Sequence, residues 1–402
     1  MRRGAPSKLI KKIAPFALLM LLASCSEKIE NAVYAHDQCH RLTLTDSNTG
    51  LSVLGAEDMA KLPSGDLLVT AYDRRSTTDN GTPPEGGIYI VPAKQLGEKE
   101  IKVPSLFDTL PGGLRPHGVD AVHLKNDFVK VAFINRSYEQ KSDTTINAPT
   151  IYTFLLKGKT AFAPEKVAGS FCRANDLVLA NLSEAAIAAK KPVYGNIDQS
   201  PLNPHNSLNF QARQWTTLDR HYCEGIAAHF ENITGMKAGS VTAQPLRFAD
   251  KIDAYPIFKS AEKLAFPNGI GIQFKDRPLG DNNFLVVAET RANQLRYFPK
   301  TDRRDIVKLD GNPDNLNVGK PGIIQVAVHP SLFKLALYRY GWASYAPSRI
   351  QKVTGTQVLT LFDDPSGRLY SAASIAVQTA GKLVLGSVGD EGLLVCNARQ
   401  TS

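Results

Sequence analysis

Four short segments of the sequence carry carboxylate and amide side chains that could act together on a metal ion. Their oxygens come without thiolates or clustered histidines, and such ligands suit a hard cation, Ca²⁺ before Mg²⁺. Taken singly, each segment has an ordinary explanation, because Asn-Gly and Pro-Asp-Asn are common turn signals and Glu-Asp pairs are usually solvated. The residues concerned are Glu57-Asp58, Asn175-Asp176, Asn268 in Pro267-Asn268-Gly269, and Asp314-Asn315.

Neighbouring side chains in these pairs point to opposite sides if the backbone is extended, as it is in a β-strand. Glu57 and Asp58 are therefore poorly placed to form one acid–base pair, and the same holds for Asn175 and Asp176. Each pair can instead serve two different sites, one on each side of its strand.

The elements that must hold these residues are predominantly strands. From about Leu51 onward the apolar runs are short, rich in β-branched and aromatic residues, and bounded by Gly, Asn, Asp and Pro, which predicts β-structure. A polar turn followed by two apolar strands recurs loosely, which favours radially repeated blades without fixing their number. The clearest strand segments are 66–72, 87–91, 128–135, 151–156, 284–289, 294–298, 323–329 and 382–386.

Residues 181–263 fit this repeat worst. They include the best helix prediction, 183–191, with Ser183 as N-cap and a lysine-rich end, followed by a stretch rich in Pro, Asn, Gln and His. We interpret them as an insertion or an embellished blade over one face, not as a separate domain. The fold class is therefore all-β, with a few short helices or loops over one face.

The N-terminus has the pattern of a bacterial lipoprotein signal. Positively charged residues precede an apolar stretch, 13–23, which is too short for the ~20 residues of a transmembrane helix. It ends in Leu22-Ala23-Ser24-Cys25, which resembles a lipobox, where the cysteine is lipidated and becomes the mature N-terminus. The alternative is an ordinary secretory signal. We expect a signal peptide at 1–24, an anchor and linker at 25–38, and a folded body at 39–398, attached to the membrane by lipid only. Ser26 after the cysteine favours the outer membrane.

The formal charge of +9 does not indicate a nucleic-acid partner. Five positive charges lie in the signal region, so the rest carries about +4 (9 − 5), with no basic block and no interleaving of basic and aromatic residues. The sequence also lacks the G-x-S-x-G, H-E-x-x-H, P-loop and G-x-G-x-x-G motifs. It therefore does not indicate a serine hydrolase of the α/β type, a zinc protease, a P-loop NTPase or a dinucleotide-binding enzyme. The five charges are those of Arg2, Arg3, Lys8, Lys11 and Lys12.

Together, the ligand segments resemble the paraoxonase/arylesterase family. The resemblance runs from about Cys39 to Cys396 and is poorest at 181–263. The matching segments, in chain order, are GAEDMAKLPSGDLLVT (55–70), LRPHGVD (114–120), ANDL (174–177), FPNGIGI (266–272), PDNLNV (313–318), IQVAVHP (324–330) and GKLVLGSV (381–388) with LLVC (393–396).

This resemblance implies a six-bladed β-propeller with two calcium ions stacked in its central tunnel. The partition between the two ions agrees with the alternation of side chains along a strand. By position, the ligands of an upper, catalytic ion would be Glu57, Asn175, Asn268, Asp314 and Asn315. Those of a lower, structural ion would be Asp58, Asp176 and the backbone carbonyl of Val119.

Three further residues are assigned by the same resemblance. His117 matches the histidine proposed in the family to activate the attacking water, and His329 would line the substrate pocket. Arg136 stands where the family has the second histidine of a dyad. Arginine has no acceptor and does not titrate in proteins, so it cannot relay a proton from His117. Near His117 it would favour the neutral imidazole, which is still a usable base.

The function implied is calcium-dependent hydrolysis of a small lactone or aryl ester, in which the metal polarises the carbonyl and an activated water attacks it. Two alternatives stay open. One is a non-catalytic, calcium-stabilised surface propeller that binds a partner or a sugar, and Arg136 favours it. The other is a sugar lactonase of the gluconolactonase type, which usually has fewer tunnel ligands.

Four cysteines remain besides Cys25, and their spacings do not indicate zinc. Export would allow disulfides to persist, so two bridges are the default expectation. The family resemblance implies a bond between Cys39 and Cys396 at the two ends of the body. Pairing of Cys172 with Cys223 is then a weaker expectation with no motif behind it.

Overall fold

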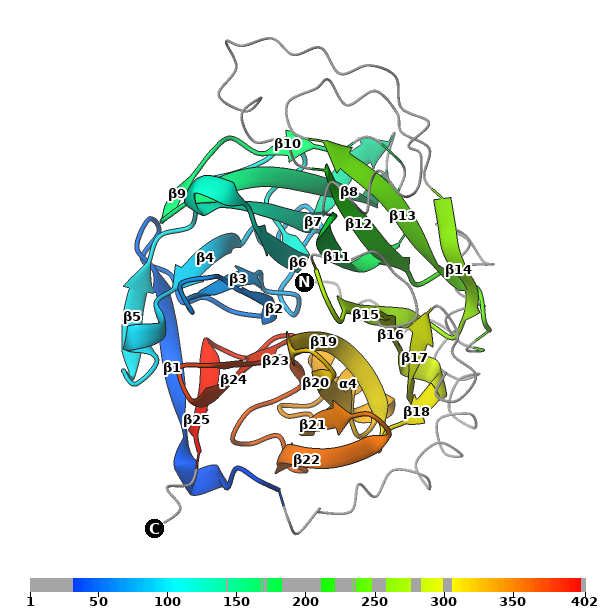
Figure 1. Ribbon diagram of the computed structural model, residues 1–402. Helices are drawn as coiled ribbons and strands as arrows, with labels where there is room; N and C mark the ends of the chain where they lie inside the picture. Colours follow the sequence, from blue (N-terminus) through cyan, green and yellow to red (C-terminus); the bar gives the residue numbers. More distant parts are fainter. Residues whose placement is uncertain are drawn as a thin grey trace, which may run out of the picture.

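Six sheets surround a central axis in the computed structural model, as in a β-propeller (Figure 1). Each sheet is one blade, and neighbouring first strands contact each other in a closed ring around the axis. This confirms the predicted all-β, six-bladed architecture. The structure describes residues 32–141, 144–167, 169, 171, 173–182, 211–220, 234, 236–247, 258–275, 283–298 and 306–398.

The blades follow one another along the chain. Blade one contains β2 (Ala56–Lys61), β3 (Leu67–Ala71) and β4 (Gly87–Val91); blade two contains β6 (Pro116–His123), β7 (Phe128–Lys141), β8 (Thr144–Lys157) and β10 (Glu165–Lys166), with β9 (Thr160–Ala161) beside β8. Blade three contains β11 (Ala174–Leu182), β12 (Gln211–Leu218), β13 (Gly239–Arg247) and β14 (Phe258–Leu264). Blade four contains β15 (Pro267–Ile272), β16 (Leu285–Glu289), β17 (Gln294–Phe298) and β18 (Ile306–Lys308). Blade five contains β19 (Asn312–Lys320), β20 (Ile323–His329), β21 (Ser348–Thr354) and β22 (Gln357–Asp364).

Blade six joins the two ends of the propeller. It contains β23 (Ala373–Thr379), β24 (Lys382–Ser387) and β25 (Leu393–Asn397), and then β1 (Cys39–Asp46), which pairs antiparallel with β25. β5 (Glu100–Val103) pairs with β1 in parallel on the outside. The predicted disulfide between Cys39 and Cys396 is present, at a sequence separation of 357 residues. In the chain-entropy model so long a loop stabilises the fold by roughly 5–6 kcal/mol.

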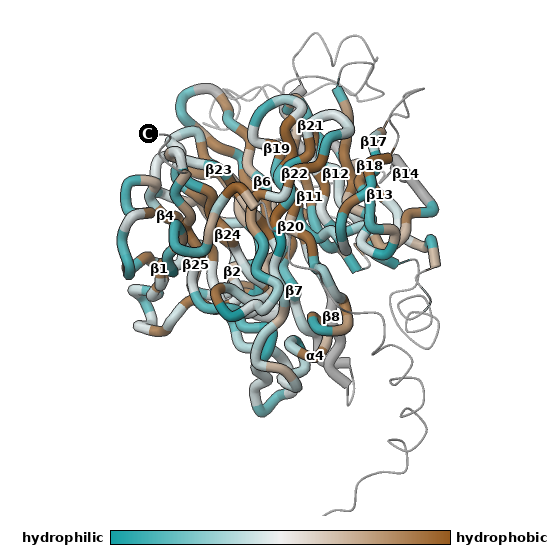
Figure 2. Tube along the Cα trace, turned by 90° about the horizontal axis from the view of Figure 1, so that it is seen from below, coloured by the Kyte–Doolittle hydropathy of each residue, from teal (hydrophilic) through white to brown (hydrophobic). Residues whose placement is uncertain are grey.

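The apolar core is divided among the gaps between blades. Each of six buried clusters unites side chains of two consecutive blades, so both faces of most strands are covered. Strands covered on both faces consist of nearly continuous apolar runs, and β3, with the sequence LLVTA, is buried at every position. Figure 2 shows this as hydrophobic colour along the strands inside the disc.

Helical structure is sparse in the described residues. One α-helix, α4 (Leu332–Arg339), follows β20. Its N-cap is Ser331, whose side chain accepts a hydrogen bond from the Lys334 N–H at 3.3 Å. The 3₁₀ turns are η3 (His36–Gln38), η4 (Ala93–Gln95), η5 (Lys125–Asp127) and η6 (Thr290–Ala292).

Several sequence predictions lie outside the described residues, namely the helix at 183–191, the signal peptide with Cys25, and the cysteines at 172 and 223. The segment 181–263 supplies three strands of blade three, β12, β13 and most of β14, so it belongs to the propeller. Within the described part of the chain, no helix combines the length and the apolar character needed to cross a membrane.

Candidate functional site

The innermost strand of every blade contains a shift of register close to its start. Such β-bulges leave extra residues unpaired and re-aim their side chains, and they are frequent next to active sites. Every ligand side chain predicted from the sequence lies at one of these shifts. The shifts fall at Ala56/Asp58, Pro116/Val119, Ala174/Leu177, Pro267/Ile270, Pro313/Leu316 and Ala373/Ile375.

Two Pro-x-Gly segments let neighbouring inner strands approach closely at these bulges. A Cβ atom on Gly118 would lie 2.7 Å from the Cα of Asp176, and one on Gly269 would lie 2.6 Å from the carbonyl oxygen of Asp314. Atoms do not approach so closely without displacement, so both positions require glycine. The two glycines therefore allow the ligand pairs of blades three and five to come against blades two and four.

Three threonine hydroxyls fix the same segments from the preceding blade. Thr70 in β3 donates to the carbonyl of His117 at 2.5 Å, and Thr217 in β12 donates to that of Asn268 at 2.7 Å. Thr290, after β16, donates to the carbonyl of Pro313 at 2.7 Å. These buried bonds hold the backbone under the ligand side chains, which makes the arrangement rigid.

The residues predicted for the upper ion lie together. Asn175 Oδ1 is 2.8 Å from His117 Nε2, and Asn315 Nδ2 donates to the backbone carbonyl of Glu57 at 3.2 Å. Asn268 Nδ2 donates to Asp314 Oδ1. We call Glu57, His117, Asn175, Asn268, Asp314 and Asn315 the upper layer, and each is at most 7% exposed.

The two aspartates predicted for the lower ion lie on the other side of the same bulges. Asp58 accepts from the N–H groups of Met59 and Val119 at 2.8 and 2.7 Å. Asp176 accepts from those of Leu177 and Ile270 at 2.7 and 2.9 Å. We call Asp58, Asp176 and the backbone of Val119 the lower layer. The side chains of Glu57 and Asp58 thus lie in different layers.

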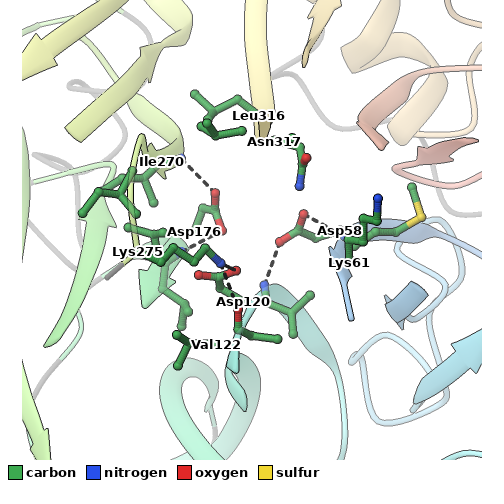
Figure 3. A pocket seen from close by; sticks show the side chains of 18 of the residues that line it. Asp58, Lys61, Asp120, Val122, Asp176, Ile270, Lys275, Leu316 and Asn317 are labelled. Atoms are coloured by element: carbon green, nitrogen blue, oxygen red, sulfur yellow. Dashed lines mark hydrogen bonds and ion pairs between the residues drawn. The ribbon is translucent and has the colours of Figure 1, made fainter. Parts of the chain in front are cut away.

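The lower layer faces a cavity of about 630 Å³, formed by the later residues of the inner strands. Figure 3 shows the carboxylates of Asp58, Asp120 and Asp176 pointing into it from three blades. Burial raises the pKa of Asp58 well above its ordinary value, and the neighbouring Glu57 adds to this. Burial and then Asp58 do the same for the pKa of Asp176. Within the described part of the chain, backbone N–H groups supply the hydrogen bonds to these two buried carboxylates, and this favours a cation between them.

The upper layer also suits a hard cation. Among the described residues, the buried oxygens Oδ1 of Asn268 and Oδ1 of Asn315 have no hydrogen-bond partner. Buried polar atoms without partners are rare and require an explanation, such as an ion. The described residues contain no group of three or more His, Cys, Asp or Glu side chains arranged for a metal. Both layers instead combine carboxylates with amide or backbone oxygens, which is the chemistry of calcium ligands.

His117 is engaged through both ring nitrogens. Its Nδ1 lies 2.6 Å from Glu57 Oε2 and 2.8 Å from Arg74 Nη2, while Nε2 faces Asn175. Burial lowers the pKa of His117 to about 4; Glu57 opposes this, and Arg136 and Arg74 add to it. The imidazole is therefore neutral at pH 7. Arg136, which contributes to this lowering, is half-buried.

His329, the predicted pocket residue, is part of the same neighbourhood. Its Nε2 lies 2.7 Å from Asp314 Oδ2, and its side chain is only 3% exposed. Its Nδ1 has no hydrogen-bond partner among the described residues. His329 therefore orients one of the two carboxylates of the upper layer.

Three charged residues at the tunnel were missed by the sequence interpretation. Arg74 follows β3 and donates to Glu57 Oε2 at 3.2 Å, with a side chain only 5% exposed. Asp120 and Lys275 form an ion pair at the wall of the lower cavity (Figure 3). Arg74 lies in a loop outside the matched motifs. The one signal in the sequence that could have indicated its place at the tunnel is its position two residues after Tyr72, just beyond the end of β3.

Likenesses to known proteins are distant. No protein-family model matches the chain, and no curated protein matches it. Similar solved structures include a provisionally assigned gluconolactonase, with 12% identity over 90% of this chain and 93% of the other and a TM-score of 0.47. A protein of unknown function from Dyadobacter fermentans has 9% identity, coverages of 90% and 100%, and a TM-score of 0.46. An α-L-arabinanase from Penicillium chrysogenum has 12% identity, coverages of 90% and 98%, and a TM-score of 0.44. None of these likenesses bears on the chemistry of the site.

Proposed function

We propose that this protein is a calcium-dependent hydrolase of small lactones or aryl esters, with a site similar to that of the paraoxonase/arylesterase family. The observation that carries the proposal is the pair of buried amide oxygens, on Asn268 and Asn315, that have no partner among the described residues. They lie in the same layer as the carboxylates of Glu57 and Asp314. When bound there, calcium would supply a Lewis acid that polarises an ester carbonyl.

The residues of the chain would divide the remaining work. Glu57 and Asp314 balance the charge of the ion, and the amides of Asn175, Asn268 and Asn315 complete its oxygen shell. Asp58, Asp176 and the carbonyl of Val119 would hold a second, structural ion. Because the upper layer is buried and held by bonds between blades, its dipoles are oriented before the substrate arrives, which strengthens electrostatic stabilisation of developing charge.

His117 remains the proposed base for the attacking water. It is neutral at pH 7, as a base must be, and it lies within the upper layer. Both of its nitrogens are within hydrogen-bonding distance of protein groups, so one of these contacts must open before the ring can accept a proton from water. Arg136 cannot assist by proton transfer.

A second proposal is a non-catalytic propeller that retains calcium for stability. Two observations favour it, namely the arginine at position 136 and the engagement of both nitrogens of His117. In that case the lower layer alone would need to bind an ion. The two proposals differ in whether the calcium-loaded protein turns over any ester.

The experiment that tests the hydrolase is a panel of lactones and aryl esters, assayed with the purified full chain before and after chelation of calcium. We expect hydrolysis of at least one class, lost on chelation and restored by Ca²⁺. Glu57→Gln should lower kcat/KM roughly 100-fold or more, because changes even to groups around a metal's ligands lower activity 10–100-fold. Glu98→Gln, at an exposed surface position, is the matched control and should leave kcat/KM unchanged. Calcium-dependent stabilisation without turnover of any panel member would favour the scaffold.

We also propose that the protein is exported and attached to the bacterial envelope by a lipid on Cys25, which lies outside the described residues. Cys25→Ser should release the protein from the membrane fraction or block its maturation. Cell fractionation and mass spectrometry of the mature N-terminus measure both. A Cys25→Ser protein that is processed and fractionates as before would exclude the lipid anchor.

A further inference from the structure

Arg74 is held in a fixed position beside the upper layer. Its Nη1 donates to the carbonyl oxygens of Gly55 and Tyr72 at 3.1 and 3.4 Å, and its guanidinium lies 3.9 Å from the centre of the Tyr72 ring. These contacts direct Nη2 at Glu57 and His117. Its Nε is buried with no partner among the described residues. The side chain therefore serves the tunnel and is not available to solvent or to a surface partner.

The charge of Arg74 acts on the carboxylate that the upper ion would need. The guanidinium Nη2 lies 3.2 Å from Glu57 Oε2, and both side chains are at most 6% exposed. The carboxylate is thus already compensated by a cation from its own chain. In the lower layer, the hydrogen bonds that Asp58 and Asp176 accept from described residues come from backbone N–H groups, and each of those groups carries only a partial charge.

We propose that Arg74 is a built-in cation that competes with the divalent ion for Glu57 and thereby sets the affinity of the upper site. This inference rests on the proposed calcium site, and it concerns a residue that the family resemblance does not assign. An ion bound to Glu57 would share its carboxylate with a fixed guanidinium 3.2 Å from Oε2. The repulsion between the two cations weakens binding of the ion, because both lie in a buried site where charges interact strongly.

The expected size of the effect follows from proton binding. A charge within about 4–6 Å typically changes a proton-binding equilibrium by roughly tenfold to a thousandfold. Arg74→Met removes the charge and keeps most of the apolar stem over Tyr72, so the dissociation constant of the upper ion should fall at least about tenfold. Arg74→Lys keeps a positive charge near Glu57, and its affinity should stay closer to that of the wild type than to that of Arg74→Met.

The chain offers a matched control in the next residue. Arg75 donates from Nε to the carbonyl of Tyr338 at 3.2 Å, and its guanidinium lies 4.0 Å from the centre of the Tyr338 ring. It thus stacks on a tyrosine as Arg74 does, but on helix α4 instead of the tunnel. Arg75→Met should leave both calcium affinities unchanged. Circular dichroism checks that each variant is folded.

The measurement is isothermal titration of Ca²⁺ into the chelator-treated full chain, for the wild type and the variants Arg74→Met, Arg74→Lys and Arg75→Met. The expected result is a gain of at least about tenfold in the affinity of one ion in Arg74→Met alone, or the appearance of a second ion there. Adding Asn268→Ala to Arg74→Met should abolish that gain, which assigns it to the upper layer. Two ions with wild-type affinities in Arg74→Met would overturn the inference and leave the proposed function standing. Absence of calcium binding in both the wild type and Arg74→Met would overturn both.

Discussion

Glu57 and Asp58 are neighbours in one strand and are both buried, but their surroundings shift their pKa values in opposite directions. The pKa of Glu57 is lowered to about 2 and that of Asp58 is raised well above its ordinary value. Burial acts to raise both. The difference arises because Glu57 has His117 and Arg74 beside it, whereas Asp58 has the negative charges of Glu57 and then Asp120 beside it, which act against the hydrogen bonds from two backbone N–H groups.

The comparison shows that the two layers of the tunnel reach stability by different routes. The upper layer carries its own positive charge, so it can keep its geometry without an ion. The lower layer brings two buried carboxyl groups together, so the ion proposed to bind there would stabilise the fold directly. Under the proposed function, the lower layer would hold the structural ion and the upper layer the catalytic one.

The largest effect should come from His117 in the upper layer. General-base assistance is typically worth ~10²–10⁴-fold, so His117→Ala should lower kcat/KM for a lactone or aryl ester within that range. Calcium-dependent stabilisation should persist, because the lower layer is intact. Steady-state kinetics and thermal melts with and without Ca²⁺ measure the two properties separately. A fully active His117→Ala protein would show that another group takes the proton.

The next effect should separate the layers by stability. In the wild type, calcium at about 100 times its dissociation constant should stabilise the fold by about 2.7 kcal/mol. Asp58→Ala and Asp176→Ala should lose most of this gain, whereas Asn268→Ala should keep it and lose activity instead. Melting temperatures with and without Ca²⁺, together with kcat/KM, decide the matter. Equal stability losses with unchanged catalysis in all three variants would contradict the division into two layers.

The sequence predicted the strands better than the charges that surround the tunnel. The predicted segments 87–91, 294–298 and 323–329 coincide with β4, β17 and β20, because turn residues bound each of these strands. The ligands of both layers lie in local motifs, which can be read without knowing the fold. Arg74 and Lys275 reach the tunnel from loops, and only the closure of the propeller brings them there. Helix α4 was missed, because one short helix between two strands makes a weak pattern.

The free-energy cost of burying a charged side chain can be measured outside the tunnel, at Lys130 in β7. Its side chain is 4% exposed, and burial lowers its pKa to about 8, with Glu165 acting in the opposite direction. A base whose pKa is lowered by folding destabilises the fold while it is charged in the unfolded state, and this penalty fades as pH rises from about 8 toward 10.5. Lys130→Met should therefore raise the free energy of unfolding at pH 7 by up to about 3 kcal/mol.

The advantage of Lys130→Met over the wild type should shrink at pH 10.5, and denaturant unfolding at the two pH values measures it. Lys102→Met is the control, because Lys102 is exposed in β5. If Lys130→Met is less stable than the wild type at both pH values, the contacts of Lys130 outweigh its burial. The free-energy cost of burying a charge would then also be smaller than expected for the carboxyl groups of the lower layer.

The smallest expected effect comes from Gly269, where one change reaches both layers. It lies between Asn268 of the upper layer and Ile270, whose N–H binds Asp176 of the lower layer at 2.9 Å. An added Cβ would lie 2.6 Å from the carbonyl oxygen of Asp314, so β15 and β19 must move apart. Overpacking of this kind typically costs 1–3 kcal/mol. Gly97→Ala is the matched control, because nothing lies within 4 Å of its added Cβ, and it should leave stability unchanged or raise it slightly. Gly269→Ala should also weaken both calcium affinities together, which titration would show. If only one affinity changes, the two layers are less tightly joined through β15 than the backbone contacts indicate.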